Sequence, residues 1–384
     1  MYCQRAFLSH KKMKIGIITF HAAFNYGSML QAYALQTYLS RQGHDVEIIN
    51  YRSHYQKSIY YKPFDIHSIY SILSSFKRLL LYPSSLCRLK TKWELFNSFL
   101  NQNLKITKEY NTIHELERVP WDYDLLITGS DQIWNTGAPD SGEAYFGNFI
   151  NNANTKKIAY APSLGQYPEN VDTKFLKAQI RNFTALSVRE EKAKDLLIKY
   201  GIAKDISVVC DPTLLLDVQA YERLYREEPL IQGKYIFFYT PVGLPLDYFK
   251  IVNDFAETLG MPVITERAYY PKDIKKYKHI MNYPEVGPSE FLNLIKNATY
   301  VCGGSFHLQA FSILFRKEFY CINGDKDSRT HNLLVKLGLE DRIVSLSHPT
   351  IVTSHPTINY DNISNKLTYY REPSFDFLNK YTVK

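Results

Sequence analysis

Residues 14–51 read KIGIITFHAAFNYGSMLQAYALQTYLSRQGHDVEIINY, and this stretch decides the fold. Its first part, 14–20, is a short apolar run rich in Ile and followed by polar residues, which is typical of a buried strand. A helix is expected over 29–39, where apolar residues recur near helical spacing, and Gly43 ends it. A second strand is expected at 46–51. One strand–helix–strand unit predicts a parallel sheet with helices on its faces.

Outward from this unit, the alternation of strands and helices continues to about residue 215, stops, and restarts. The interruption is a polar stretch at 217–234 with a Pro and a Gly, which we interpret as a linker. Two α/β units joined by a linker predict two Rossmann-like lobes with a cleft between them. We expect an N-terminal lobe at 13–215, a C-terminal lobe at 235–345 and a helical tail at 346–384.

Composition limits the class of protein. The chain has 384 residues, of which 45% are hydrophobic and 22% charged, and its net charge is +8. These values exclude a largely disordered chain, a collagen and a coiled-coil rod. The 31 Tyr and 22 Phe residues are unusual. Tyr combines a flat apolar face with a polar tip, which suits carbohydrate contacts, although codon bias explains the number equally well.

The cysteines and the N-terminus indicate the compartment. The five cysteines are odd in number, widely spaced and without a CxxC pair, so neither a disulfide framework nor a zinc site is expected. Residues 1–12 lack the apolar core of a signal peptide, and an upstream translation start would explain them. No apolar run of about 18 residues occurs, so no transmembrane helix is expected. We therefore expect a cytoplasmic protein with reduced thiols.

A basic, aromatic segment at 55–92 carries most of the charge asymmetry. Seven basic residues face a single acid, Asp65, and aromatic residues interleave them. Such a segment could contact anionic lipid headgroups at the inner face of the membrane or hold an anionic acceptor, or it could be a solvated helical face. Nucleic acid is not expected, because no recognition motif accompanies the charge. The basic residues are Lys57, Lys62, Lys77, Arg78, Arg88, Lys90 and Lys92.

Three loops that follow predicted strands hold the candidate functional residues. Open α/β sheets bind ligands at the carboxyl ends of their strands. The first loop, Asn25-Tyr26-Gly27, precedes a helix, whose N-terminus favours an anion or a hydroxyl; it also fits an ordinary turn with a helix cap. The second, 129–135 (GSDQIWN), offers Asp131, Gln132 and Trp134 to a sugar ring; a capping Asp with a core Trp fits as well.

The third loop, Ser305-Phe306-His307, follows a Gly-rich turn. A His at this position suits acid–base chemistry or phosphate binding, although a lone His is more often structural. Arg189 ends the strand at 186–189 and could bind phosphate or carboxylate in a bidentate fork, or it could pair with Glu190 on the surface. No nucleotide-binding or hydrolase motif and no carboxylate-rich metal cluster is present in the sequence.

Together these motifs resemble the polysaccharide pyruvyl transferase family. The resemblance covers roughly 14–345 and implies two Rossmann-type lobes in a glycosyltransferase-B-like arrangement. The matching stretches are IGIITFHAAFNYGSMLQAYALQTYL at 15–39, DLLITGSDQIWN at 124–135, KIAYAPSLG at 157–165, LSVREE at 186–191, VCDPTLLL at 209–216 and CGGSFHLQAFSILFRKEF at 302–319.

The resemblance implies transfer of a pyruvyl group from phosphoenolpyruvate to a sugar or a lipid-linked oligosaccharide, as a cyclic ketal, in capsule, exopolysaccharide or cell-wall synthesis. By position it assigns donor binding to Arg189, Ser305 and His307. The scheme needs an acid and a base, for which we select His307 and Asp131, and it needs no metal or cofactor. The acceptor is expected at Asn25, Tyr26, Gly27, Asp131, Gln132 and Trp134. The sequence departs from many members at Cys302-Gly303-Gly304, where they carry a polar residue.

Two other functions stay open at this point. A two-lobed glycosyltransferase that uses a nucleotide sugar would share the same organisation. A non-catalytic glycan-binding protein of a capsule assembly system would bind sugar without releasing phosphate from phosphoenolpyruvate.

Overall fold

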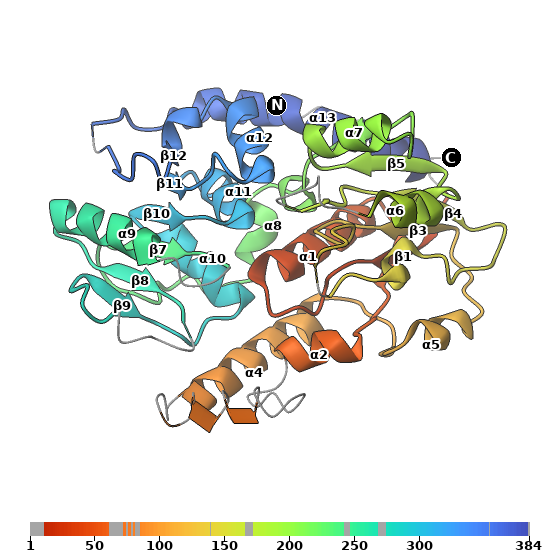
Figure 1. The fold of residues 1–384 in the computed structure, drawn as a ribbon, viewed down its shortest axis with the longest axis horizontal. Helices are drawn as coiled ribbons and strands as arrows, with labels where there is room; N and C mark the ends of the chain where they lie inside the picture. The colour runs from red at the N-terminus through yellow and green to blue at the C-terminus, as the bar shows by residue number, and fades with distance from the viewer. Residues whose placement is uncertain are drawn as a thin grey trace.

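Two separate parallel sheets, each covered by helices, form the framework of the molecule (Figure 1). The prediction of two α/β lobes is therefore confirmed, because no strand pairs across from one sheet to the other. The computed structural model describes residues 11–60, 72–73, 76–77, 80, 85–138, 140–165, 172–241, 246–267, 274–352 and 354–382.

The first sheet has the order β2-β1-β3-β4-β5-β6. Its central strands are continuous apolar runs, because helices cover both faces of a parallel sheet. In register, Ile15 of β1 lies opposite Val46 of β2 on one side and Leu125 of β3 on the other. The chain reverses its direction across the sheet between β1 and β3. The strands are β1 (Lys14–Ile18), β2 (Asp45–Ile48), β3 (Leu125–Thr128), β4 (Lys156–Ala159), β5 (Ala185–Val188) and β6 (Ser207–Val208).

The second sheet repeats this plan in the order β12-β11-β10-β7-β8-β9, with its reversal between β7 and β10. Two of its strands were not predicted, since β9 and β12 are only three and two residues long and carry little periodic signal. The strands are β7 (Ile236–Tyr239), β8 (Val263–Thr265), β9 (Ile280–Asn282), β10 (Tyr300–Gly303), β11 (Glu318–Ile322) and β12 (Ile343–Val344).

The helices connect these strands. The first begins at Tyr26, three residues before the predicted start, because the Asn25 side chain caps it by accepting from the N–H groups of Gly27 and Ser28. The helices are α1 (Tyr26–Arg41), α2 (His54–Tyr60), α4 (Ser85–Asn103), α5 (Ile113–Glu117), α6 (Thr173–Ile180), α7 (Glu191–Lys199), α8 (Gln219–Glu222), α9 (Leu246–Leu259), α10 (Pro288–Asn297), α11 (Phe306–Leu314), α12 (Ser328–Leu337) and α13 (Tyr360–Thr382), with short 3₁₀ turns η1 (Glu143–Phe146), η3 (Pro212–Leu214) and η4 (Glu340–Arg342).

One apolar core is shared by the two lobes. It joins side chains of β1 and α1 to those of α10 and α11, while two smaller cores fill the outer faces of the two sheets. At its centre the ring of Tyr26 stacks on that of Phe291 of the second lobe, with centroids 4.5 Å apart. The lobes are thus held together by buried apolar area, the dominant stabilising contribution in folding.

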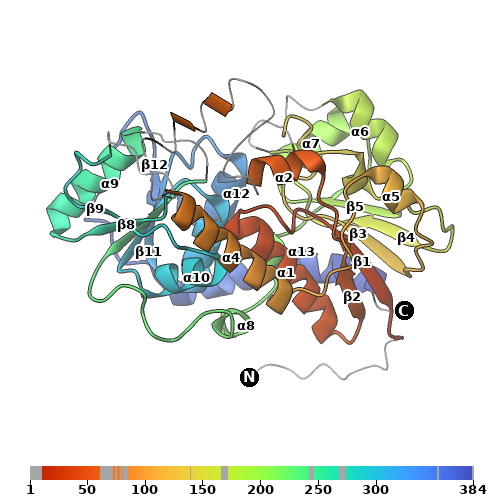
Figure 2. The same ribbon diagram turned by 90° about the horizontal axis from the view of Figure 1, so that it is seen from below.

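Two helices cross from one lobe to the other (Figures 1 and 2). Trp93 and Phe96 of α4 lie against Phe24 of the first lobe, and α4 also packs on α10 of the second. The tail helix α13 packs on α12 and returns to the first sheet, where Ser374 accepts a hydrogen bond from the Cys210 N–H. Among the described residues, no helix is both long and apolar enough to span a bilayer.

Candidate functional site

Polar side chains gather where the carboxyl edges of the two sheets face each other. The first sheet reverses between β1 and β3, and the second between β7 and β10; ligands of open α/β sheets bind at such switch points. The loop after β1 and the loop after β10 meet directly at Gly27 and His307. Neighbouring strands of the first sheet add one polar group each: Thr19 after β1, Asp131 after β3, Ser163 after β4, Arg189 after β5 and Asp211 after β6.

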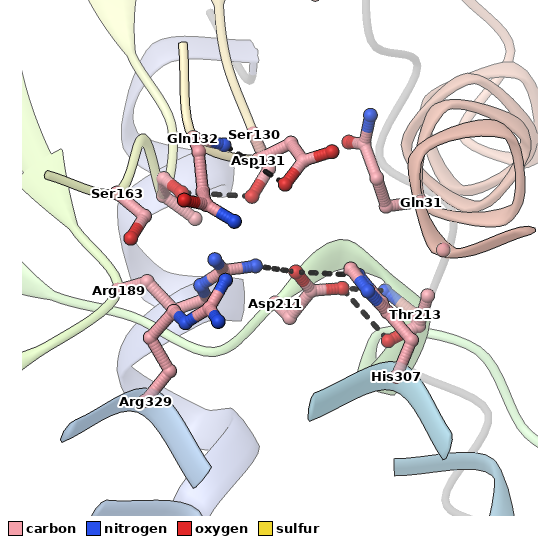
Figure 3. A network of polar contacts seen from close by, with 12 residues as sticks. Gln31, Ser130, Asp131, Gln132, Ser163, Arg189, Asp211, Thr213, His307 and Arg329 are labelled. Atoms are coloured by element: carbon pink, nitrogen blue, oxygen red, sulfur yellow. Dashed lines mark hydrogen bonds and ion pairs between the residues drawn. The ribbon is translucent and has the colours of Figure 1, made fainter. Parts of the chain in front are cut away.

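A buried ion network occupies the centre of this region (Figure 3). Arg189 is 1% exposed, and its Nη1 donates to Oδ2 of Asp211 at 2.5 Å while its Nε donates to Glu190 at 3.1 Å. Asp211 is fully buried and also accepts from the N–H and the hydroxyl of Thr213, at 2.9 and 2.7 Å. Burial opposes the ionised form of Asp211, but the surrounding His307 and Arg189 outweigh it and hold its pKa well below the usual range.

His307 reaches the same carboxylate from the second lobe. Ser305 caps α11 by accepting from the Leu308 N–H, which fixes the first turn on which His307 lies. Nε2 of His307 lies 3.4 Å from Oδ2 of Asp211, close enough for an ion pair, yet it has no hydrogen-bond partner. Arg189 and His307, which the sequence predicted to share one donor molecule, therefore lie on two sides of Asp211.

The imidazole of His307 fills the space that a side chain at position 27 would occupy, so only Gly fits there. A Cβ at Gly27 would lie 2.0 Å from Nδ1 of His307, a distance that real contacts do not allow. The backbone of α1 thus forms one wall of the histidine site. The ring is confined between this wall and Asp211.

Replacing Gly27 with Ala is expected to displace the imidazole of His307, because the added Cβ would occupy its space. If His307 takes part in a reaction, turnover should fall by about 10- to 100-fold, the effect of moving a catalytic group by about 1 Å. The protein should still fold, since Ala favours a helix more than Gly does. Steady-state kinetics and a melting curve check both points. Gly142→Ala is the matched control, because nothing lies within 4 Å of a Cβ there. Equal turnover in the two variants would contradict this account of Gly27.

Asp131 lies across from this network, at the end of β3. It is 5% exposed and adopts a left-handed backbone conformation, with φ at 65°. Its carboxylate accepts from the hydroxyl of Ser28 and from the Gln132 N–H. The side chain of Gln132 is partly buried and accepts from Asn135. The structure therefore keeps Asp131 at the lobe boundary, where its charge acts on Arg189.

Three predicted acceptor residues lie elsewhere or have other partners. Trp134 is completely buried: it is 0% exposed and lies in the outer core of the first lobe against Phe146 and Phe183. Its prediction as a sugar-stacking residue is therefore wrong. Tyr26 is also buried, and its hydroxyl donates to Glu266 at 2.5 Å. Asn25 acts as the cap of α1.

Sequence reasoning missed several members of the network. Asp211 was not selected as a candidate, although it follows a strand and so gives the same signal that selected Arg189. Arg329 at the start of α12 lies beside Arg189 (Figure 3) and pairs with Asp327 through two hydrogen bonds, of 2.8 and 2.5 Å. Nothing in the sequence indicated it, because α12 itself was not predicted.

Several buried polar atoms around this site have no hydrogen bond. They include Nη2 of Arg189, Nε2 of His307 and Oε1 of Gln31. A buried polar group without a hydrogen bond is uncommon, so such atoms mark places where a ligand or water binds. Among the described residues, no group of three or more His, Cys, Asp or Glu side chains is arranged to hold a metal ion.

Comparison with known proteins identifies relatives of this arrangement. A family model described as polysaccharide pyruvyl transferase matches residues 25–326, most of the chain. No curated protein matches it. Among solved structures, S. aureus MnaA with UDP is 12% identical with a TM-score of 0.50, covering 97% of this chain and 90% of that one. An alpha-glucosyltransferase in complex with UDP is 10% identical with a TM-score of 0.50, covering 96% of each chain. These likenesses show a glycosyltransferase-B-like fold.

Proposed function

Because the chain belongs to the polysaccharide pyruvyl transferase family, we propose that it transfers a pyruvyl group from phosphoenolpyruvate to two hydroxyls of a sugar in surface polysaccharide synthesis. The observation that carries this proposal is the pair of nitrogen donors, the unpartnered Nη2 of Arg189 and the imidazole of His307, brought together from the two lobes around Asp211. Phosphoenolpyruvate carries a carboxylate and a phosphate, the anions that a guanidinium and an imidazolium bind best.

The donor site draws on both lobes. Arg189 is positioned by Asp211 and Glu190, which leaves one of its nitrogens free to bind an anionic group of the donor. Arg329 adds a second guanidinium close by. This second cation adds positive charge for an anionic donor in a chain whose residues Cys302-Gly303-Gly304 lack the polar residue of other family members. Ser305 contributes by capping the helix that presents His307.

The residues fit the proton transfers that the reaction needs. His307 donates a proton to the methylene carbon of phosphoenolpyruvate, which becomes a methyl group and leaves C2 electrophilic. The first sugar hydroxyl attacks C2 and gives its proton to Asp131. The C2–O bond to phosphate breaks, and the phosphate leaves with its electron pair. The second hydroxyl then attacks C2 and loses its proton to the departing phosphate, which closes the ketal.

Phosphate release tests the proposal. Purified protein is incubated with phosphoenolpyruvate and a panel of free and lipid-linked sugars, and inorganic phosphate is measured with and without each sugar. Sugar-dependent release supports the proposal. Stabilisation of the protein by UDP-sugars but not by phosphoenolpyruvate would instead favour a nucleotide-sugar glycosyltransferase. Sugar binding without any phosphate release would favour a non-catalytic glycan-binding protein.

We also propose that the acceptor is held near an anionic membrane surface by part of the segment 55–92. Its residues Leu73, Phe76 and Leu80 recur at helical spacing and are 63%, 56% and 81% exposed. Lys77, next to Phe76 in the sequence, and Lys90 of α4 are exposed as well. Exposed apolar and basic side chains within one segment are typical of an interfacial membrane contact. Lys62 and Arg78 lie outside the described residues.

One basic residue of that segment has a different role. Lys92 pairs with Glu266 of the second lobe and lies over the ring of Tyr26, 5.1 Å from its centroid. Its side chain is only 16% exposed. Lys92 therefore helps to join the lobes and is not available to a lipid surface.

Changing Leu73, Phe76 and Leu80 together to Ser should weaken binding to liposomes that contain phosphatidylglycerol by at least about 10-fold, because each apolar side chain contributes roughly 1.5–3 kcal/mol when buried. Co-sedimentation measures the bound fraction. Met281, Val352 and Tyr369, which are also exposed at 56%, 45% and 71%, supply a matched triple Ser control. Unchanged sedimentation of the first triple variant would show that no such contact exists.

A further inference from the structure

Gln31 of α1 is completely buried, and only one end of its carboxamide is satisfied. Its Nε2 donates to Oγ1 of Thr19 at 2.9 Å, to the Ser28 carbonyl at 2.9 Å and to the Phe20 carbonyl at 3.2 Å. Its Oε1 has no partner. Leaving a buried acceptor without a hydrogen bond destabilises the folded protein, so this oxygen requires a donor that the described residues do not supply.

The orientation of this carboxamide is fixed by its neighbours. Exchanging its oxygen and nitrogen would set Oε1 against the carbonyls of Phe20 and Ser28, which carry no proton to donate. Thr19 cannot compensate, because its hydroxyl proton is already directed to the Ser130 carbonyl at 3.0 Å. The unpartnered atom is therefore the oxygen, which is an acceptor only.

The free oxygen is on the side of Gln31 that is directed toward Asp131. Figure 3 shows the carboxamide of Gln31 directed toward the carboxylate of Asp131. Ser28 connects the two, since its carbonyl accepts from Gln31 and its hydroxyl donates to Asp131. An amide oxygen and an ionised carboxylate are both acceptors, so neither can satisfy the other. A ligand that satisfies both groups must bring two O–H donors.

We propose that Gln31 and Asp131 form a receptor for the acceptor diol, each accepting from one of its two hydroxyls. This inference rests on the proposed function, which requires two hydroxyls of one sugar. Asp131 takes the proton of the attacking hydroxyl. Gln31, which cannot ionise, holds the second hydroxyl through its proton until that proton passes to the departing phosphate, and leaves the lone pairs of the hydroxyl oxygen free to attack C2. The pair thereby selects sugars whose two hydroxyls point to the same side.

The test is a ligand-observed NMR titration without phosphoenolpyruvate. The probes are methyl β-D-galactopyranoside, which offers both a vicinal pair and a more widely spaced pair of hydroxyls, and deoxy analogues that each lack one hydroxyl. Gln31→Met should weaken binding of the parent glycoside by about 2- to 12-fold, the contribution of one neutral hydrogen bond. One deoxy analogue should bind the wild type and Gln31→Met with equal affinity. It lacks the hydroxyl that Gln31 would hold, so the hydrogen bond to Gln31 is absent in both cases.

Gln36→Met is the matched control on the same helix. Gln36 is also buried, but both ends of its amide are satisfied by backbone: it donates to the carbonyls of Val46 and Lys105 and accepts from the Lys105 N–H. This variant should bind every probe as the wild type does. If Gln31→Met does not fold, the wild type with the deoxy analogues still tests the inference, since removal of either of the two bound hydroxyls should weaken binding.

Three results would overturn the inference. The first is equal binding of the parent glycoside by Gln31→Met and the wild type. The second is that every missing hydroxyl lowers the affinity of Gln31→Met as much as it lowers that of the wild type. The third is no binding of the parent glycoside by the wild type. The first would show that water satisfies Gln31. Phosphate release by the wild type is measured separately, so diol binding without phosphate release would reject the pyruvyl transfer and keep the diol receptor.

Discussion

Replacing Asp211 with Ala is expected to destabilise the protein by about 3–5 kcal/mol, because it leaves the guanidinium of Arg189 buried without its main counter-ion. Both side chains are almost completely buried, so water cannot take the place of the lost carboxylate. The two hydrogen bonds from Thr213 are lost as well. Urea unfolding at neutral pH measures the change in the free energy of unfolding.

Asp254→Ala is the matched control, since Asp254 pairs with Lys250 on the surface with side chains 55% and 66% exposed. Such pairs contribute at most about 1 kcal/mol.

The pH dependence of the free energy of unfolding gives a second check on Asp211. The folded pKa of Asp211 is depressed, so its contribution is present above the unfolded pKa of about 3.9 and is lost as the pH falls below that value. A cost equal to that of Asp254→Ala would reject the ion network as a stabilising feature.

Replacing His307 with Ala should lower kcat by at least about 100-fold if His307 donates the proton to the donor's methylene carbon. The ring is held between Gly27 and Asp211, so the acid is already oriented before substrate binds. Single-turnover measurements with phosphoenolpyruvate and an accepting sugar separate chemistry from binding.

His307→Asn distinguishes the two roles of this residue. Asn can donate a hydrogen bond to the donor but cannot transfer a proton at neutral pH. Turnover by this variant close to that of the wild type would make His307 a binding residue and require another acid. His331 of α12, which is exposed, serves as the control for replacing a histidine.

Arg189 has two roles that a single substitution cannot separate, since it is proposed to bind the donor and it also neutralises buried carboxylates. From the sequence, Arg189→Ala would be expected mainly to weaken donor binding. In the structure the same change also leaves Asp211 and Glu190 buried without their cation. Donor affinity of an Arg189 variant is therefore meaningful only beside its melting curve.

The elements of the candidate site could be predicted because their signals are local. Apolar runs of four to five residues predicted β1, β3 and β7, because a parallel strand is buried on both faces and so is apolar at nearly every position. The loops that follow strands then identified Asp131, Arg189 and His307, because the carboxyl edge of a parallel sheet is where polar side chains converge. Short elements such as β12 and the helix that carries Arg329 left no comparable signal.

The sequence by itself determined the two α/β lobes and the three loops that reach their boundary, since strand and helix periodicity depends on neighbouring residues. Only the tertiary structure decided which residues meet there. It placed Asp211 between Arg189 and His307, buried Trp134 in an outer core, and paired Lys92 with Glu266, 174 positions away. It also left one oxygen of Gln31 without a partner. These outcomes depend on how two separately folded sheets pack against each other, and no pattern along the chain records that geometry.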